Sequence, residues 1–103
     1  PYEAVEEMPF FPGGDAALLK YIGDSTKYPT NAMAKNIQGK VVVRFAVEAD
    51  GSIDRASILK SVDPELDAEA IRVINSLPFF KPGIKDGKPV PVWYAVPITY
   101  TLK

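Results

Sequence analysis

The stretch KVVVRFAVEADGSIDRASILK, residues 40–60, decides the fold of this chain. Four apolar residues of its first half share one parity: Val41, Val43, Phe45 and Val47. The residues of the other parity are more mixed: Val42, Arg44, Ala46 and Glu48. An alternation of period two predicts a β-strand over residues 40–49, with one face on a core and the other partly solvated.

The second half of the stretch predicts a hairpin. Asp50-Gly51 favours a tight turn because both residue types tolerate the positive φ that such turns need. In the return strand, Ile53 and the pair Ala56 and Ile58 fall on opposite parities. A β-bulge between them would bring all three onto the core face.

The C-terminal segment predicts a second long strand, over about residues 90–102. Seven apolar or aromatic residues share one parity: Val90, Val92, Tyr94, Val96, Ile98, Tyr100 and Leu102. Pro91 and Pro97 fall on the other parity and remove two N–H donors from one edge. Because proline in a sheet is confined to edges, first residues or bulges, the odd residues should face outward from an edge strand.

This edge has two compatible interpretations. The prolines can simply blunt the strand against aggregation. Alternatively, the remaining outward groups of Trp93, Ala95 and Thr99 can accept a guest strand from a partner. Trp93 is likewise either an ordinary surface aromatic residue or an anchor for that partner.

Three helical segments complete the pattern. Asp15 is a candidate N-cap for a helix that Gly23 would end. A short helix after Pro29 would carry an apolar stripe of Ala32, Met33 and Ile37 up to Gly39. A further helix opens at Asp63-Pro64-Glu65 and ends at Pro78, with a buried stripe of Leu66, Ala70, Val73, Ile74 and Leu77. The sum is an α+β, two-layer domain in which about three antiparallel strands pack one face against two or three short helices.

Two similar stretches, PFFPGG at residues 9–14 and PFFKPG at residues 78–83, flank this pattern. The sequences that follow them differ, so they are not a repeat unit. Neither stretch has the spacing of a phosphate-binding loop, and Asp15 would repel a phosphate at the first. We interpret them as hydrophobic corners, one at each end of the fold, with the phenylalanines of the first fastening the lead-in to the core.

Composition narrows the class of function. A chain of 103 residues with a net charge of −1 fits one domain and lacks the basic footprint of a nucleic-acid binder. It has no histidine and no cysteine, and we expect its acidic cluster at residues 63–69 to stabilise a helix start. The sequence therefore predicts no enzyme, no cofactor and no metal site. No apolar run could span a bilayer. The chain begins abruptly at Pro1 without a signal peptide, so we expect a domain excised from a longer protein.

Residues 28–102 resemble the C-terminal domain of TonB proteins. The matching features, in chain order, are Tyr28-Pro29, Gly39 with Val41 and Val43, Asp50-Gly51, Leu66-Asp67 with Ala70, Phe80-x-Pro82, and Asp86-Gly87-Lys88-Pro89-Val90. The segment PFFPGGDAALLKYI is similar to the lead-in of one branch of the family. The resemblance divides a single domain, residues 1–103, into a lead-in with a short helix (1–27) and a core (28–103).

The resemblance implies a function. Such domains lie in the periplasm of Gram-negative bacteria, attached to an inner-membrane helix that an ExbB–ExbD motor drives by proton-motive force. They capture the TonB box of outer-membrane transporters as an added β-strand. The implied partner-binding residues are Val92, Trp93, Tyr94, Ala95, Val96, Ile98, Thr99 and Tyr100 on the last strand, with Thr26, Lys27 and Tyr28 before the short helix. Pro97 departs from the family pattern, which affects the pairing register.

Two other partnerships follow from the same resemblance. TonB-like domains also occur at the periplasmic end of membrane sensors and peptidase-type regulatory proteins. The edge strands of short TonB fragments can pair with each other, which implies an edge-strand homodimer. The transporters and their cargo are not specified by these residues.

Overall fold

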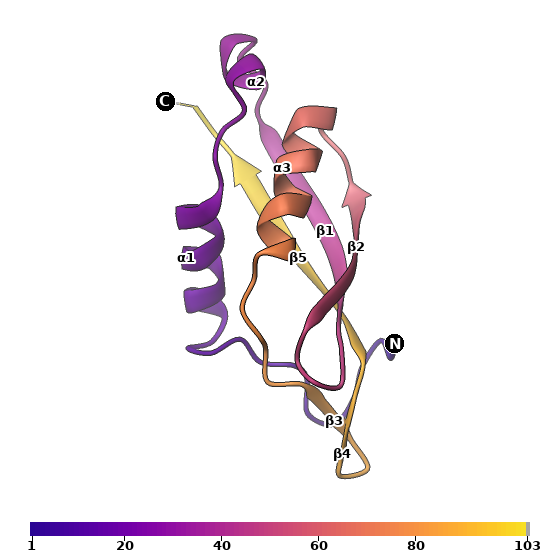
Figure 1. Cartoon of the computed structure of the whole chain (residues 1–103). Helices are drawn as coiled ribbons and strands as arrows, with labels where there is room; N and C mark the ends of the chain where they lie inside the picture. The colour runs from indigo at the N-terminus through magenta and orange to yellow at the C-terminus, as the bar shows by residue number, and fades with distance from the viewer. Residues whose placement is uncertain (103) are drawn as a thin grey trace.

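The computed structural model describes residues 1–102 as an elongated α+β domain (Figure 1). Its helices and strands share one hydrophobic core. Its central sheet has three antiparallel strands in the order β2-β1-β5. Their bounds are Gly39–Val47 for β1, Ile53–Lys60 for β2 and Val92–Tyr100 for β5. The predicted fold class is confirmed, and β5 lies at an edge of the sheet.

The central strand β1 pairs with β5 in one unbroken register, from Gly39 opposite Tyr100 to Val47 opposite Val92. The residues of the predicted core face that lie within β1 and β5 are buried, apart from half-buried Tyr94: Val41, Val43, Phe45, Val47, Val92, Val96, Ile98 and Tyr100. The last strand is shorter than predicted, because Val90 belongs to a separate short strand and Leu102 follows the end of β5.

The predicted bulge in β2 is present. The register against β1 shifts between Arg44 and Ala46, and Arg55 adopts a φ of 57° at that point. The extra residue brings Ile53, Ala56 and Ile58 against the core, as expected. A second shift, between Val42 and Val43, was not predicted.

Two helices pack on the core face of the sheet. Helix α3, Pro64–Asn75, lies across β1 and β2, and helix α1, Asp15–Ser25, stands beside β5 (Figure 1). Asp63 caps α3 by accepting a hydrogen bond from the Glu65 amide, 3.0 Å away, and all five predicted stripe residues are buried. This helix ends at Asn75, before Pro78.

The other two helices differ from the predictions in their boundaries. Asp15 is the first residue of α1 rather than its cap, which is Gly14. Gly23 lies inside α1, because it keeps a helical backbone and the helix continues to Ser25. Helix α2 is only Thr30–Ala34, so Ile37 lies beyond its end. Of the predicted apolar stripe, Ala32 is buried and Ile37 packs against the core, but Met33 is exposed. Gly39 opens β1 instead of ending a helix.

The two similar corners contact each other, which corrects their predicted placement at opposite ends of the fold. Phe10 and Lys81 exchange two backbone hydrogen bonds of 2.9 and 2.8 Å. Phe11 and Phe80 are both buried and meet edge to face, with ring centroids 5.2 Å apart. Phe10, by contrast, is exposed, so one phenylalanine of the first stretch fastens the lead-in to the core.

The lead-in continues along a small hairpin of β3, Gly83–Lys85, and β4, Lys88–Val90. Asp86 and Gly87 form its turn, both with positive φ. Glu7 bridges to Ile84 through backbone bonds of 3.2 and 2.8 Å. The first residues of the lead-in are therefore extended and paired. No helix within residues 1–102 is long and apolar enough to cross a membrane.

Candidate strand-addition site

The odd residues of β5 direct their backbone groups away from β1. The Trp93 amide donates to the Tyr2 carbonyl at 2.8 Å, and the Tyr2 amide donates to the Pro91 carbonyl at 2.9 Å. Tyr2 thus forms a parallel bridge beside Val92, on the outer side of the edge. Successive residues of a strand point to opposite edges, so Ala95, Pro97 and Thr99 also face outward. This confirms the parity argument made from the prolines.

The lead-in occupies only the beginning of this edge. The Tyr2 carbonyl accepts the hydrogen bond from the outward N–H of Trp93, which corrects the expectation that this donor is free for a guest strand. Among residues 1–102, the outward groups of Ala95 and Thr99 and the carbonyl of Pro97 make no backbone hydrogen bond outside the sheet. Two donors separated by one proline therefore remain on the open part of β5.

A groove runs between this edge and α1. Its upper part has a volume of about 460 Å³ and is lined by Leu19, Ile22, Gly23, Thr26, Tyr28, Lys40, Pro97, Ile98, Thr99, Tyr100 and Thr101. Its lower part, about 200 Å³, is lined by Asp15, Leu18, Leu19, Tyr94, Ala95, Val96 and Pro97. Leu19 and Pro97 line both parts, so the two parts adjoin along the unpaired edge. We call it the α1–β5 groove.

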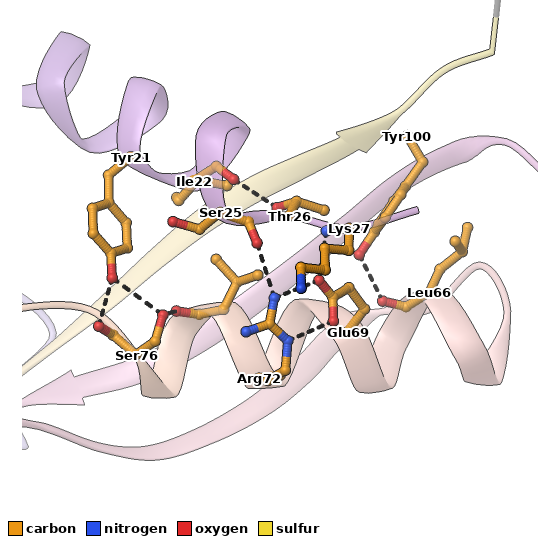
Figure 2. Close-up of polar contacts among 11 residues, drawn as sticks. Tyr21, Ile22, Ser25, Thr26, Lys27, Leu66, Glu69, Arg72, Ser76 and Tyr100 are labelled. Atoms are coloured by element: carbon orange, nitrogen blue, oxygen red, sulfur yellow. Dashed lines mark hydrogen bonds and ion pairs between the residues drawn. The ribbon is translucent and has the colours of Figure 1, made fainter. Parts of the chain in front are cut away.

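Of residues 26–28, which were predicted from the resemblance alone, Thr26 and Tyr28 line the upper part of this groove and Lys27 does not. The Thr26 hydroxyl donates to the Ile22 carbonyl at 2.6 Å, and the Lys27 amide donates to a Glu69 carboxylate oxygen at 2.6 Å (Figure 2). The Tyr28 ring packs edge to face on Tyr100 with centroids 5.4 Å apart. The fold therefore places this segment beside the C-terminal part of β5.

Polar contacts fasten α1 to α3. Arg72 donates to the Ser25 carbonyl at 2.9 Å and to both carboxylate oxygens of Glu69 at 2.7 Å, as Figure 2 shows. The Tyr21 hydroxyl donates to the Ser76 carbonyl at 2.7 Å. Hydrogen bonding from Arg72 is the main cause that lowers the pKa of Glu69. These contacts fix the helix that forms one wall of the α1–β5 groove.

Two tyrosines of β5 hold the other wall in place. The Tyr94 hydroxyl donates to Asp15 at the start of α1, 3.1 Å away, and the Tyr100 hydroxyl donates to the Leu66 carbonyl of α3 at 3.0 Å. Burial is the main cause that raises the pKa of both hydroxyls, and neighbouring carboxylates raise it further. Both side chains therefore act as neutral donors that join β5 to the helices.

The opposite face of the sheet carries Trp93. The Arg44 guanidinium lies 3.8 Å from the centroid of its ring and donates to Glu3 of the lead-in at 2.8 Å. Trp93 is half-buried by these contacts. A partner strand added to β5 would reach Trp93 on this face and α1 on the other.

The predicted site residues divide into two groups. On β5, Trp93, Ala95 and Thr99 lie on the outward edge, whereas the side chains of Val92, Tyr94, Val96, Ile98 and Tyr100 face the core. Sequence reasoning missed Tyr2, Leu19 and Gly23. In the sequence, Leu19 lies off the helix face that Leu18 shares with Ile22, which was the available signal for an apolar surface residue. Only the packing of α1 shows that this residue lines the groove.

Comparison with known proteins identifies the class of this domain. Residues 24–102 match the family described as Gram-negative bacterial TonB protein C-terminal. The chain belongs to this family, as its resemblance implied.

Individual relatives agree with that assignment. The chain is 43% identical over 61 residues to Protein TonB of Haemophilus influenzae, covering 58% of this chain and 23% of the relative. It is 31% identical over 83 residues to Protein TonB of Helicobacter pylori, covering 80% of this chain and 28% of the relative. The chain thus spans about a quarter of the length of these relatives.

Solved structures show the same fold. The solution structure of the Helicobacter pylori TonB-CTD, residues 194–285, superposes with a TM-score of 0.63 at 28% identity, covering 85% of this chain and 92% of that chain. The solution structure of the Pseudomonas aeruginosa TonB CTD gives a TM-score of 0.58, also at 28% identity, covering 76% and 79%. Most of α1 precedes residue 24, so the family match does not include the helix that forms the outer wall of the groove.

Proposed function

We propose that this domain captures the TonB box of outer-membrane transporters by β-strand addition to β5, and transmits force derived from the inner-membrane proton gradient. The observation that carries the proposal is the open edge at Ala95, Pro97 and Thr99. These residues face a groove, and no backbone partner among residues 1–102 occupies them. Backbone pairing gives affinity with loose side-chain requirements, which suits an adaptor for several transporters.

The rest of the fold suits the transmission of force. β5 is bonded along its inner side to β1 over nine residue pairs, and its two tyrosines join it to both helices. A pull on a guest strand would therefore be spread over the sheet rather than carried by one contact. In this proposal an ExbB–ExbD motor acts through an inner-membrane anchor, this domain lies in the periplasm, and no step needs a catalytic residue.

A backbone NMR titration with TonB-box peptides from the same organism tests the proposal. We expect the largest amide shifts at Ala95 and Thr99, with smaller ones at residues 26–28. A synthetic peptide with proline at alternate positions is the matched control, because it lacks the donors that strand addition needs. Shifts confined to α3, or none with millimolar peptide, would refute the proposed site.

A further inference from the structure

Gly23 is not explained by the fold. It lies within α1, where glycine is less favourable than alanine, and its φ is not positive. A Cβ atom built on it would meet nothing within 4 Å, so no close contact requires a glycine there. The space that its missing side chain leaves open belongs to the α1–β5 groove.

Leu19 lies one turn earlier on the same helix and also lines the groove. Its side chain is 53% exposed, although neighbouring Leu18 and nearby Ile22 are buried in the core. An exposed leucine and a helical glycine four residues apart share one helix face. Leu19 therefore offers an apolar side chain to the groove, and Gly23 leaves open space one turn later, both beside the unpaired edge of β5.

The edge defines what the groove can hold. A strand added beside Ala95, Pro97 and Thr99 would place its residues opposite Val96 and Ile98 on the same face as those two side chains. That face is the one on which α1 packs, since Val96 and Ile98 belong to the same core cluster as Leu18 and Ile22. Alternate guest side chains would therefore enter the α1–β5 groove, while the others would face the side of Trp93.

We propose that Leu19 and Gly23 determine which guest strands the domain accepts, by admitting a branched apolar side chain at the positions opposite Val96 and Ile98. The inference rests on the proposed strand addition and adds a side-chain requirement to it. The volume of the upper part of the groove, about 460 Å³, lies within the range of roughly 300–1,000 Å³ that is usual for ligand pockets. Its occupant is an extended peptide with apolar residues at alternate positions.

Two capped synthetic peptides, KTVTVTK and KTATATK, test the requirement. They have the same length, charge and strand-forming backbone groups, and they differ only at the two alternate positions. Titrations followed by NMR report pairing through the amides of Ala95 and Thr99, and groove occupancy through the methyl groups of Leu19. With the unmodified domain we expect the valine peptide to bind about tenfold more tightly, because two larger apolar side chains are removed from water.

Variants of α1 separate specificity from folding. We expect Gly23→Leu to fill the groove, which would remove the preference for the valine peptide and leave the alanine peptide unaffected. Gly23→Ala should raise the melting temperature by roughly 2 to 8 °C while reducing the preference, so weaker binding could not be attributed to misfolding. Leu19→Gln should reduce the preference as well. Ala16→Gln, on an exposed residue of α1 that does not line the groove, is the matched control.

The possible failures are distinguishable. If both peptides shift Ala95 and Thr99 but Gly23→Leu retains the full preference for valine, the inference is wrong and strand addition stands. If neither peptide shifts these amides at millimolar concentration in any variant, the proposed function itself fails, and the side-chain requirement fails with it. Equal affinity of the two peptides for the unmodified domain would also overturn the inference.

Discussion

Replacing Pro97 by alanine should strengthen capture of a guest strand. Pro97 lies between Ala95 and Thr99 on the outward edge of β5, so one guest carbonyl beside it has no donor to accept from. The substitution supplies this donor. A hydrogen bond of this kind contributes about 1 kcal/mol net, which corresponds to roughly a fivefold lower Kd.

The substitution should leave the domain folded. Pro97 is exposed and makes no inner hydrogen bond through its nitrogen, so its replacement removes no contact with β1. The reverse change, Ala95→Pro, removes an outward donor at another exposed position and should weaken binding by about fivefold or more. Ser57→Ala is the matched control, because it alters an exposed side chain on β2, at the opposite edge of the sheet.

Isothermal titration with a TonB-box peptide, supported by amide shifts, measures these differences. Sedimentation should accompany it, because an edge with one more donor is less protected against edge-to-edge pairing. The reasoning would be refuted if Pro97→Ala and Ala95→Pro both left the Kd unchanged while the peptide still shifted the β5 amides. That result would mean that the guest contacts β5 through side chains alone.

Three further predictions concern stability. Phe11→Ala should lower the free energy of unfolding by about 3–5 kcal/mol in urea titrations, because Phe11 is buried against Phe80, whereas exposed Phe10→Ala should change it by under about 1 kcal/mol. Gly51→Ala should be far more damaging than Gly87→Ala in a thermal melt: both residues have positive φ, but only at Gly51 would a Cβ clash, 2.0 Å from the Phe80 carbonyl oxygen. The raised pKa of Tyr100 means that its neutral form stabilises the fold below its ordinary value of 10.0, and that this stability is lost as pH rises above it. Urea midpoints measured from pH 8 to 11 should therefore fall more steeply for the unmodified domain than for Tyr100→Phe, and equal slopes would contradict this assignment.

Local patterns predicted the framework of the sheet correctly. The parity of Val41 to Val47 and of Val92 to Tyr100 determined which faces are buried, because side chains alternate strictly along a strand. The mismatch between Ile53 and Ala56 indicated a bulge, which Arg55 provides with its positive φ. The odd positions of Pro91 and Pro97 indicated the outward edge, because a missing N–H has the same consequence in any tertiary context.

Element boundaries were predicted less well. Gly23 was expected to end α1 and Gly39 to end a helix, but the first is helical and the second begins a strand. In both cases packing outweighs local propensity, since Ile22 is held in the core and Gly39 pairs with Tyr100. The phenylalanine pairs illustrate the same limit: no local rule distinguishes buried Phe11 from exposed Phe10.

The sequence by itself determined that this chain forms a small α+β domain with a proline-marked edge strand, and its family membership follows from the order of its motifs. Only the tertiary structure decided how that edge is used. It places Tyr2 beside Val92 at the beginning of β5, and α1 beside the rest of this edge as the wall of a groove. It also brings the two phenylalanine corners into contact. These contacts join residues that are up to about ninety positions apart. Such juxtapositions depend on how packed faces meet in space, which no local period or propensity encodes.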